Sequence, residues 1–237
     1  MAEDDFDTET LSAYLHLSAA QVARLAERGK LPARKVAGDW RFSRPEIHHW
    51  LEERIGLSDE EELLEVEGLL DDAAPADEAD RLSLAELLPL EAIEFPLPAR
   101  TRNSVINSMV ELAARTGWLW DPQKMAEAVR SREDMHPTAL ESGVALMHPR
   151  RPMPSILGQP LLALGRTERG IPFGGSRGVL TDTFFLICST DDRGHLLALA
   201  RLSRLIAAPE FLGQLRAAPD ARTIRQCILE AEQSLPG

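Results

Sequence analysis

The sequence predicts an α/β protein preceded by a small helical domain, and three observations support this fold class. Between residues 83 and 235, helical patterns alternate with short apolar runs, which is typical of a mixed sheet flanked by helices. Residues 6–56 instead show short amphipathic helices and a hairpin pattern, as in a winged helix-turn-helix domain. A strongly acidic stretch, residues 57–82, separates these regions. We therefore expect two domains joined by an acidic linker.

Composition and charge leave several functions open. The formal net charge of −12 is concentrated in one segment, since residues 57–100 hold 2 basic and 14 acidic side chains. The overall acidity therefore does not exclude a basic face that binds nucleic acid. Cys188 and Cys227 lie in apolar segments and are expected to be buried, reduced thiols. With no signal peptide and no membrane-length apolar run, we expect a cytoplasmic protein without membrane insertion.

The first domain begins with two predicted helices. Asp7 can cap a helix that ends near Leu15, and Ser18 can cap a second helix over residues 19–28. Gly29 follows in the position where a residue with positive φ closes a helix. Two short helices with a shared apolar seam and a tight connection predict a helix-turn-helix.

A hairpin and a third helix complete this domain. Residues 34–36 and 40–42 are predicted strands, and residues 37–39 are the turn between them. Ser43 is expected to cap a last helix from Arg44 to about Arg54. The hairpin is therefore predicted to form a small wing beside the helices.

This order of parts resembles the excisionase-like, MerR-type helix-turn-helix module over about the first fifth of the chain. The matching residues are Leu15, Ser18, Val22, Arg24, Gly29 to Ala33, Gly38, Trp40 to Phe42, Trp50 and Leu51. The resemblance implies DNA as a partner, with a recognition helix in the major groove and the wing on the backbone. The groove-facing residues would be Gln21, Arg24 and Arg28, and the phosphate-binding residues Lys30, Arg34, Lys35 and Arg41.

The alternative is a small helical domain whose arginines form a solvated face. Ala19 and Ala20 occupy positions where longer side chains could contact bases, so one module alone should bind with modest specificity. A homodimer or a second protein would strengthen DNA binding. The acidic residues 57–82 are predicted to be a flexible tether; a second interpretation is that they rest on the basic wing and compete with DNA.

The second domain, residues 83–235, is predicted to contain several helices and short buried strands. The helices are expected over residues 101–116, 122–132, 195–206, 211–215 and 221–232, and the strands over 143–147, 161–164 and 183–188.

One segment of this domain suggests a chemical function. His148 follows the apolar run of residues 143–147, and Pro149 then ends the strand because proline has no N–H to donate. We expect the imidazole to lie at a rigid strand end and to face solvent. A neutral imidazole flanked by arginines can accept a phosphoryl group whose oxygens the guanidinium groups then bind.

At this point the second domain resembles the fructose, mannitol and nitrogen-regulatory type of phosphotransferase-system IIA domain. The resemblance rests on Arg132-Glu133, on Thr138, on the strand that ends in His148, and on a later strand followed by His195. His148 lies 16 residues after Arg132, and His195 lies 47 residues after His148. These spacings match the family pattern, and the resemblance covers residues 83–235.

The resemblance implies the roles of four residues. His148 would accept a phosphoryl group from a histidine phosphocarrier protein, and His195, at the start of a helix, would donate a hydrogen bond to it. Arg132 would supply a charge-assisted contact and Thr138 a hydroxyl donor. Charge stabilisation of this kind requires neither a metal nor a cofactor, and no histidine or cysteine spacing indicates a metal site.

The chain departs from the family pattern next to His148. Met147 stands where the family usually has proline, and Pro149-Arg150-Arg151 follows the histidine. The glycine-rich residues 173–178 are interpreted as a hairpin turn, because no P-loop lysine follows them.

The sequence thus predicts a DNA-binding regulator that links the phosphotransferase system to transcription through phosphorylation of His148. One alternative is a phosphocarrier that passes the phosphoryl group to a sugar transporter subunit. The other is a binding protein with a vestigial IIA fold and no phosphotransfer.

Overall fold

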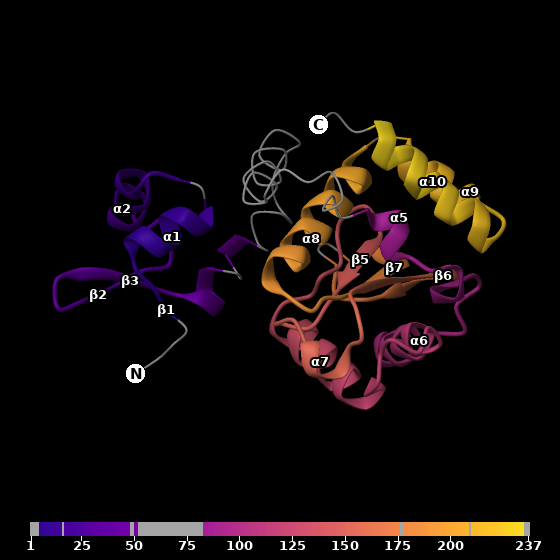
Figure 1. The fold of residues 1–237 in the computed structure, drawn as a ribbon. Helices are drawn as coiled ribbons and strands as arrows, with labels where there is room; N and C mark the ends of the chain where they lie inside the picture. The colour runs from indigo at the N-terminus through magenta and orange to yellow at the C-terminus, as the bar shows by residue number, and fades with distance from the viewer. Residues whose placement is uncertain are drawn as a thin grey trace. The chain divides into compact units, whose positions relative to one another are not determined.

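The computed structural model describes residues 5–15, 17–47, 50–51, 83–175, 178–208 and 210–234, and the chain divides into two compact units near residue 82 (Figure 1). The predicted linker and the predicted helix end at Arg54 lie outside the described residues. Within the described parts of the chain, no helix is both long and apolar enough to cross a bilayer.

The helices of the first unit begin and end where local capping signals predict. In α1, Thr8–Leu15, Asp7 accepts a hydrogen bond from the backbone N–H two residues inside the helix. In α2, Ala19–Glu27, Ser18 forms a capping box. Gly29 has φ of 66°, so it provides the positive-φ residue that ends α2. These predicted boundaries are confirmed to within one residue.

A three-stranded antiparallel sheet accompanies these helices, in the order β1-β3-β2. The strands are β1, Asp5–Phe6; β2, Arg34–Val36; and β3, Asp39–Ser43. The turn between β2 and β3 has two residues, Ala37 and Gly38, both with positive φ. The predicted three-residue turn was therefore wrong in including Asp39, which pairs with Val36. Sequence analysis missed β1 because two residues carry no alternation.

The second unit contains a four-stranded mixed sheet in the order β4-β6-β7-β5. Its strands are β4, Ile93–Glu94; β5, Val144–Met147; β6, Leu161–Pro172; and β7, Leu180–Cys188. β6 and β7 are antiparallel, whereas β4 is parallel to β6 and β5 is parallel to β7. The predicted mixed sheet is thus confirmed.

Two of these strands differ from their predictions. β6 is much longer than the predicted residues 161–164, because β6 and β7 continue as a two-stranded hairpin with a register shift between Arg166 and Ile171. β4 was not predicted, since a two-residue strand has no periodicity to recognise.

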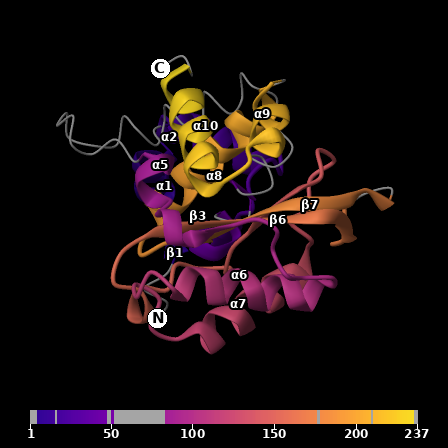
Figure 2. The same ribbon diagram turned by 90° about the vertical axis from the view of Figure 1, so that its right-hand side faces the viewer.

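Helices cover both faces of this sheet (Figure 2). Helices α6 and α7 lie on one face, and α8, α9 and α10 lie on the other. Their bounds, with those of the shorter helices, are α5, Leu84–Leu87; η2, Leu90–Ala92; α6, Arg102–Ala114; α7, Pro122–Met135; η3, Pro154–Ile156; α8, Asp192–Ala207; α9, Phe211–Ala217; and α10, Ala221–Ser234. This three-layer arrangement confirms the predicted α/β class.

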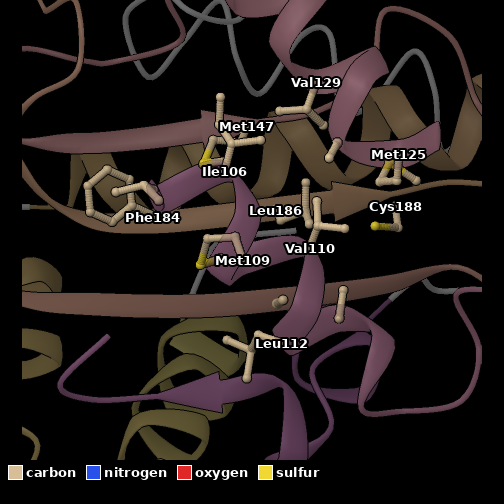
Figure 3. Close-up of a cluster of buried hydrophobic side chains, with 14 of the residues drawn as sticks. Ile106, Met109, Val110, Leu112, Met125, Val129, Met147, Phe184, Leu186 and Cys188 are labelled. Carbon is tan, nitrogen blue, oxygen red and sulfur yellow. The ribbon is translucent and has the colours of Figure 1, made fainter. Parts of the chain in front are cut away.

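The main core lies between the sheet and the pair α6 and α7 (Figure 3). Met147, Phe184 and Leu186 project from the sheet into this core, where they meet Met109 and Val129 of the helices. The intervening strand residues are also buried, since the sheet is covered on its other face as well. Burial on both faces explains why β5 and β7 read as continuous apolar runs.

Two side chains of α10 form hydrogen bonds with both ends of α5, the first described helix of the second unit. Glu232 accepts hydrogen bonds from the backbone N–H groups of Leu84, at 2.6 Å, and Ala85, at 3.0 Å. Arg225 Nε donates to the carbonyls of Ala85, at 2.9 Å, and Leu88, at 3.1 Å. One acidic and one basic side chain therefore satisfy both ends of α5, whose four residues cannot satisfy them internally.

Candidate functional site

The two predicted histidines lie side by side, although 47 residues separate them in sequence. The ring centroids of His148 and His195 are 5.0 Å apart, and the ring planes cross at 62°. His148 directly follows β5, and β7 runs parallel to β5 and leads into α8, which carries His195. Because the carboxyl ends of parallel strands meet at one edge of a sheet, the topology places both imidazoles there.

His148 is buried, with 3% of its surface exposed. The prediction that its ring faces solvent was wrong. The chain after Pro149, which is also buried, returns toward the end of β7, where the Met153 N–H donates to the Ser189 carbonyl at 3.0 Å. Nδ1 of His148 lies 2.7 Å from the Leu146 carbonyl oxygen. Since a carbonyl can only accept, Nδ1 must carry a proton, and in a singly protonated ring the lone pair then lies on Nε2.

His195 is equally buried and lies in the first turn of α8. Its Nδ1 is 3.2 Å from the Ser189 hydroxyl oxygen, a contact that fits either tautomer because a hydroxyl can donate or accept. The helix begins at Asp192, three residues before the predicted start. Asp191 caps it by accepting a hydrogen bond from the Gly194 N–H at 2.7 Å. The first turn of α8 is therefore already bonded to the Asp191 carboxylate. The contribution of this turn to the site is the side chain of His195.

Sequence analysis did not single out Ser189. A signal was present, since Ser189 directly follows β7 just as His148 follows β5. A polar residue immediately after a buried strand in an α/β sheet is a candidate site residue.

Arg132 and Glu133 are both buried in the last turn of α7. Arg132 Nη1 donates to the His136 carbonyl at 2.7 Å, so part of its guanidinium caps the helix. Burial raises the pKa of Glu133, and this effect is opposed by hydrogen bonds from Thr138 and by the nearby charges of Arg102 and Arg132.

Thr138 is connected to Glu133 and to β5. Its N–H donates to Glu133 Oε2 at 3.1 Å, and its hydroxyl donates to Glu133 Oε1. The hydroxyl that the family resemblance assigns to a phosphate thus donates to a buried carboxylate in this structure. The Thr138 carbonyl accepts the Leu146 N–H at 3.2 Å, two residues before His148.

The glycine-rich segment supports the same region. It connects the antiparallel strands β6 and β7, so the predicted hairpin turn is confirmed, with residues 176–177 outside the described part. A Cβ at Gly174, where φ is 96°, would lie 2.7 Å from the Pro137 ring. Glycine therefore permits close packing against the residue that precedes Thr138.

In the first unit, the predicted groove-facing residues divide into two kinds. Arg24 and Arg28 are exposed at the end of α2. Gln21 is exposed too, but its side-chain oxygen accepts the Ser18 N–H at 2.8 Å in the capping box. The two arginines are thus better placed than Gln21 to contact a ligand.

The predicted phosphate-binding residues lie on the hairpin and its approach. Lys30 is exposed, and Lys35 lies 4.7 Å from the centroid of the Trp40 ring. Two arginines form ion pairs with carboxylates of the same unit, Arg34 with Asp5 and Arg41 with Asp7, the latter pair at 3.7 Å.

Comparison with known proteins agrees with this geometry. The family model for the phosphoenolpyruvate-dependent sugar phosphotransferase system, EIIA 2, matches residues 86–231, which is more than half of the chain. The chain belongs to the EIIA type 2 family. A helix-turn-helix domain model matches residues 6–55, so this EIIA protein carries a helix-turn-helix domain before its EIIA domain.

Curated relatives cover the EIIA domain. A nitrogen regulatory protein of Bradyrhizobium diazoefficiens is 34% identical over 148 residues, which are 60% of this chain and 92% of that protein. A fructose-specific EIIABC component of Bacillus subtilis is 30% identical over 136 residues, which are 56% of this chain but 21% of that protein. The chain thus spans about a fifth of the length of the EIIABC relative.

Solved structures show the same fold. The nitrogen regulatory protein IIA-Ntr of Neisseria meningitidis has a TM-score of 0.54 at 22% identity, covering 61% of this chain and 97% of that one. The Escherichia coli enzyme IIA-mannitol, in complex with phosphorylated IIB-mannitol, has a TM-score of 0.52 at 16% identity, covering 61% and 99%.

The two free cysteines differ in burial: Cys188 is buried, whereas Cys227 is only partly buried, so the expectation that both are buried was wrong for Cys227. Burial raises the pKa of Cys188 to about 12, so this thiol stays protonated and unreactive. Within the described residues, no group of three or more histidine, cysteine or acidic side chains could hold a metal ion.

Proposed function

We propose that this EIIA protein is a DNA-binding regulator that accepts a phosphoryl group on Nε2 of His148. The observation that carries the proposal is the bond between His148 Nδ1 and the Leu146 carbonyl at 2.7 Å. This bond supports a proton on Nδ1, which in a singly protonated ring leaves the lone pair that can attack phosphorus on Nε2. The second imidazole, His195, lies beside it.

The bonds that form and break in the transfer step belong only to the phosphoryl donor and His148. The lone pair on Nε2 forms a bond to phosphorus while the N–P bond of a phosphohistidine carrier breaks, and the carrier imidazole leaves with that electron pair. Nδ1 keeps its proton, so phosphohistidine forms without a separate base. His195 and Arg132 then act as donors to the phosphoryl oxygens.

The DNA-binding half of the proposal rests on the first unit. Arg24 lies in the helix that corresponds to the recognition helix and Arg28 is its C-cap, and Lys30 and Lys35 are exposed basic residues that follow in the chain. Phosphorylation adds close to two negative charges to the EIIA domain, enough to change which surfaces this domain binds. The match to a nitrogen regulatory protein supports a regulatory role.

A second candidate function is transfer of the phosphoryl group to a sugar transporter subunit. The solved complex of IIA-mannitol with phosphorylated IIB-mannitol and the fructose-specific EIIABC relative favour this alternative. Acceptance of phosphate from His148 by a IIB domain of the same organism would distinguish a carrier from a regulator.

The experiment that tests phosphoryl acceptance is intact mass after incubation with phosphoenolpyruvate, enzyme I and the histidine phosphocarrier of the same organism. We expect one acid-labile phosphoryl adduct on the wild type and on His136→Ala, whose histidine is exposed. We expect none on His148→Ala. Absence of an adduct on the wild type, with a donor that phosphorylates another EIIA domain, would contradict the proposal.

A further inference from the structure

Glu133, which has no role in the proposed transfer step, is connected to His148 by a series of hydrogen bonds. The side chain of Glu133 is completely buried at the end of α7. It accepts two hydrogen bonds from Thr138, one from the N–H and one from the hydroxyl. A buried carboxylate is costly unless donors surround it, and Thr138 supplies two.

These bonds continue to His148 through β5. The Thr138 carbonyl accepts the Leu146 N–H at 3.2 Å, and the Leu146 carbonyl accepts from His148 Nδ1 at 2.7 Å. We refer to Glu133, Thr138, Leu146 and His148 as the hydrogen-bond chain. Its last bond is the one that determines which ring nitrogen of His148 carries the lone pair.

Two further contacts position the segment between α7 and β5. Gly174 packs so closely on Pro137 that an added Cβ would clash. Arg102 Nη2 lies 3.9 Å from Glu133 Oε2 and partly compensates its charge. Thr138 is therefore fixed both by a charge-assisted contact and by close packing of its neighbour.

We propose that Glu133 is a positioning residue for His148: through Thr138 and Leu146 it fixes the carbonyl that holds the Nδ1 proton, and so keeps the ring lone pair on Nε2. The tautomer and orientation of His148 follow from the hydrogen-bond chain itself. The effect on transfer rests on the proposed function.

The first test measures the tautomer with no phosphoryl donor present. Long-range proton–nitrogen spectra of the full chain report which ring nitrogen of His148 is protonated, and His148→Ala identifies its signals. We expect the Nδ1–H form in the wild type and in Glu127→Gln, an exposed carboxylate on the same helix. In Glu133→Gln and Thr138→Val, we expect a substantial fraction of the Nε2–H form.

The double variant tests whether the two residues act through one another. If Glu133 acts through Thr138, Glu133→Gln with Thr138→Val should shift the tautomer no further than either change alone. A tautomer at the wild-type value in both single variants would overturn the proposal. Thermal unfolding of each variant checks the fold, and if Glu133→Gln does not fold, Thr138→Val alone gives the result.

The second test measures transfer from the histidine phosphocarrier. We expect Glu133→Gln to slow adduct formation by about tenfold, because misplacement of a reacting group by about 1 Å costs as much as 100-fold. Glu127→Gln should react at the wild-type rate. If the tautomer shifts in the variants but the wild type accepts no phosphoryl group, the proposed function is refuted and the positioning role stands. Normal transfer with an unchanged tautomer in Glu133→Gln would refute the positioning role alone.

Discussion

The two units use charged and polar side chains in opposite ways. In the first unit, the basic residues predicted to contact DNA are largely exposed, and Arg34 and Arg41 pair with carboxylates near the surface. In the EIIA domain, the polar residues around the histidine pair are buried. They are the histidine pair itself, His148 and His195, with Ser189 beside His195, and Arg132, Glu133 and Thr138 at the end of α7 and after it.

Exposed charges in the first unit can contribute to binding affinity, whereas buried polar groups in the EIIA domain fix the geometry of the site. Ion pairs near the surface contribute little stability, so an arginine can exchange a carboxylate for a DNA phosphate at small cost. Buried polar groups must keep their partners, so each one restricts where its neighbours can lie. We therefore expect changes in the first unit to alter salt-dependent binding, and changes near His148 to alter rate and stability.

The largest effect is expected at the second histidine. His195→Ala should slow phosphoryl acceptance by about 100-fold, the usual cost of losing one donor to developing charge. Rapid-quench intact mass measures the rate. His136→Ala is the control, because that histidine is exposed and outside the pair. A wild-type rate in His195→Ala would show that the second imidazole does not assist transfer.

The next largest effect is expected where the glycine-rich segment packs on Pro137. Gly174 and Gly178 both have positive φ, but only Gly174 has an atom within 4 Å of an added Cβ. Gly174→Ala should therefore cost about 2 kcal/mol more than Gly178→Ala, a usual cost of overpacking. Chemical denaturation measures both unfolding free energies, and equal losses would show that Pro137 moves aside freely.

In the first unit, the expected effect is on DNA affinity. Arg24→Ala with Arg41→Ala should abolish gel retardation of the cognate duplex at moderate salt, because each change removes a positive charge, one from exposed Arg24 and one from partly buried Arg41. The affinity loss should be about tenfold or more and should shrink as salt rises. Arg115→Ala with Arg222→Ala, two exposed arginines of the EIIA domain, is the matched control. Retardation equal to the wild type would refute the assigned DNA-binding surface.

The smallest effect concerns pH. Burial raises the pKa of Glu133 above its ordinary value of 4.5, so the folded protein binds a proton in a pH window where the unfolded chain has released it. Glu133 therefore makes the unfolding free energy fall as pH rises through that window. A tenfold difference in proton affinity corresponds to about 1.4 kcal/mol.

Denaturation of the wild type and Glu133→Gln across this pH range measures the contribution. The wild type should lose stability relative to the variant as pH rises above 4.5. A constant difference between the two curves would show that Glu133 has the same pKa in the folded and unfolded states.

Much of the fold could be predicted because its signals are local. Asp7, Ser18 and Gly29 mark helix ends through contacts within a few residues, and those ends agree with the structure to within one residue. The buried run before His148 predicted β5 in the same way. The two-residue strands β1 and β4 were missed, because their pairing partners are distant in sequence and a pair of residues shows no pattern.

The site was predicted less completely, for the same reason. The family resemblance indicated the two histidines, and the topology brings them together. The hydroxyl of Thr138 was assigned to a ligand because its contact with the buried Glu133 depends on how the chain turns after α7. Ser189 was missed because the sequence does not show that its hydroxyl lies beside His195.

The sequence by itself indicated candidate residues for the chemistry, because the strand end before His148 is a local property and the family resemblance supplied His195, Arg132 and Thr138. It also determined the α/β class, since burial on both sheet faces requires continuous apolar strands. Only the tertiary structure decided that His148 is buried, which of its nitrogens carries the proton, and that Glu133 is connected to it. These properties depend on contacts between segments far apart in the chain, where a carbonyl or a carboxylate lies within hydrogen-bond distance only after the sheet has formed.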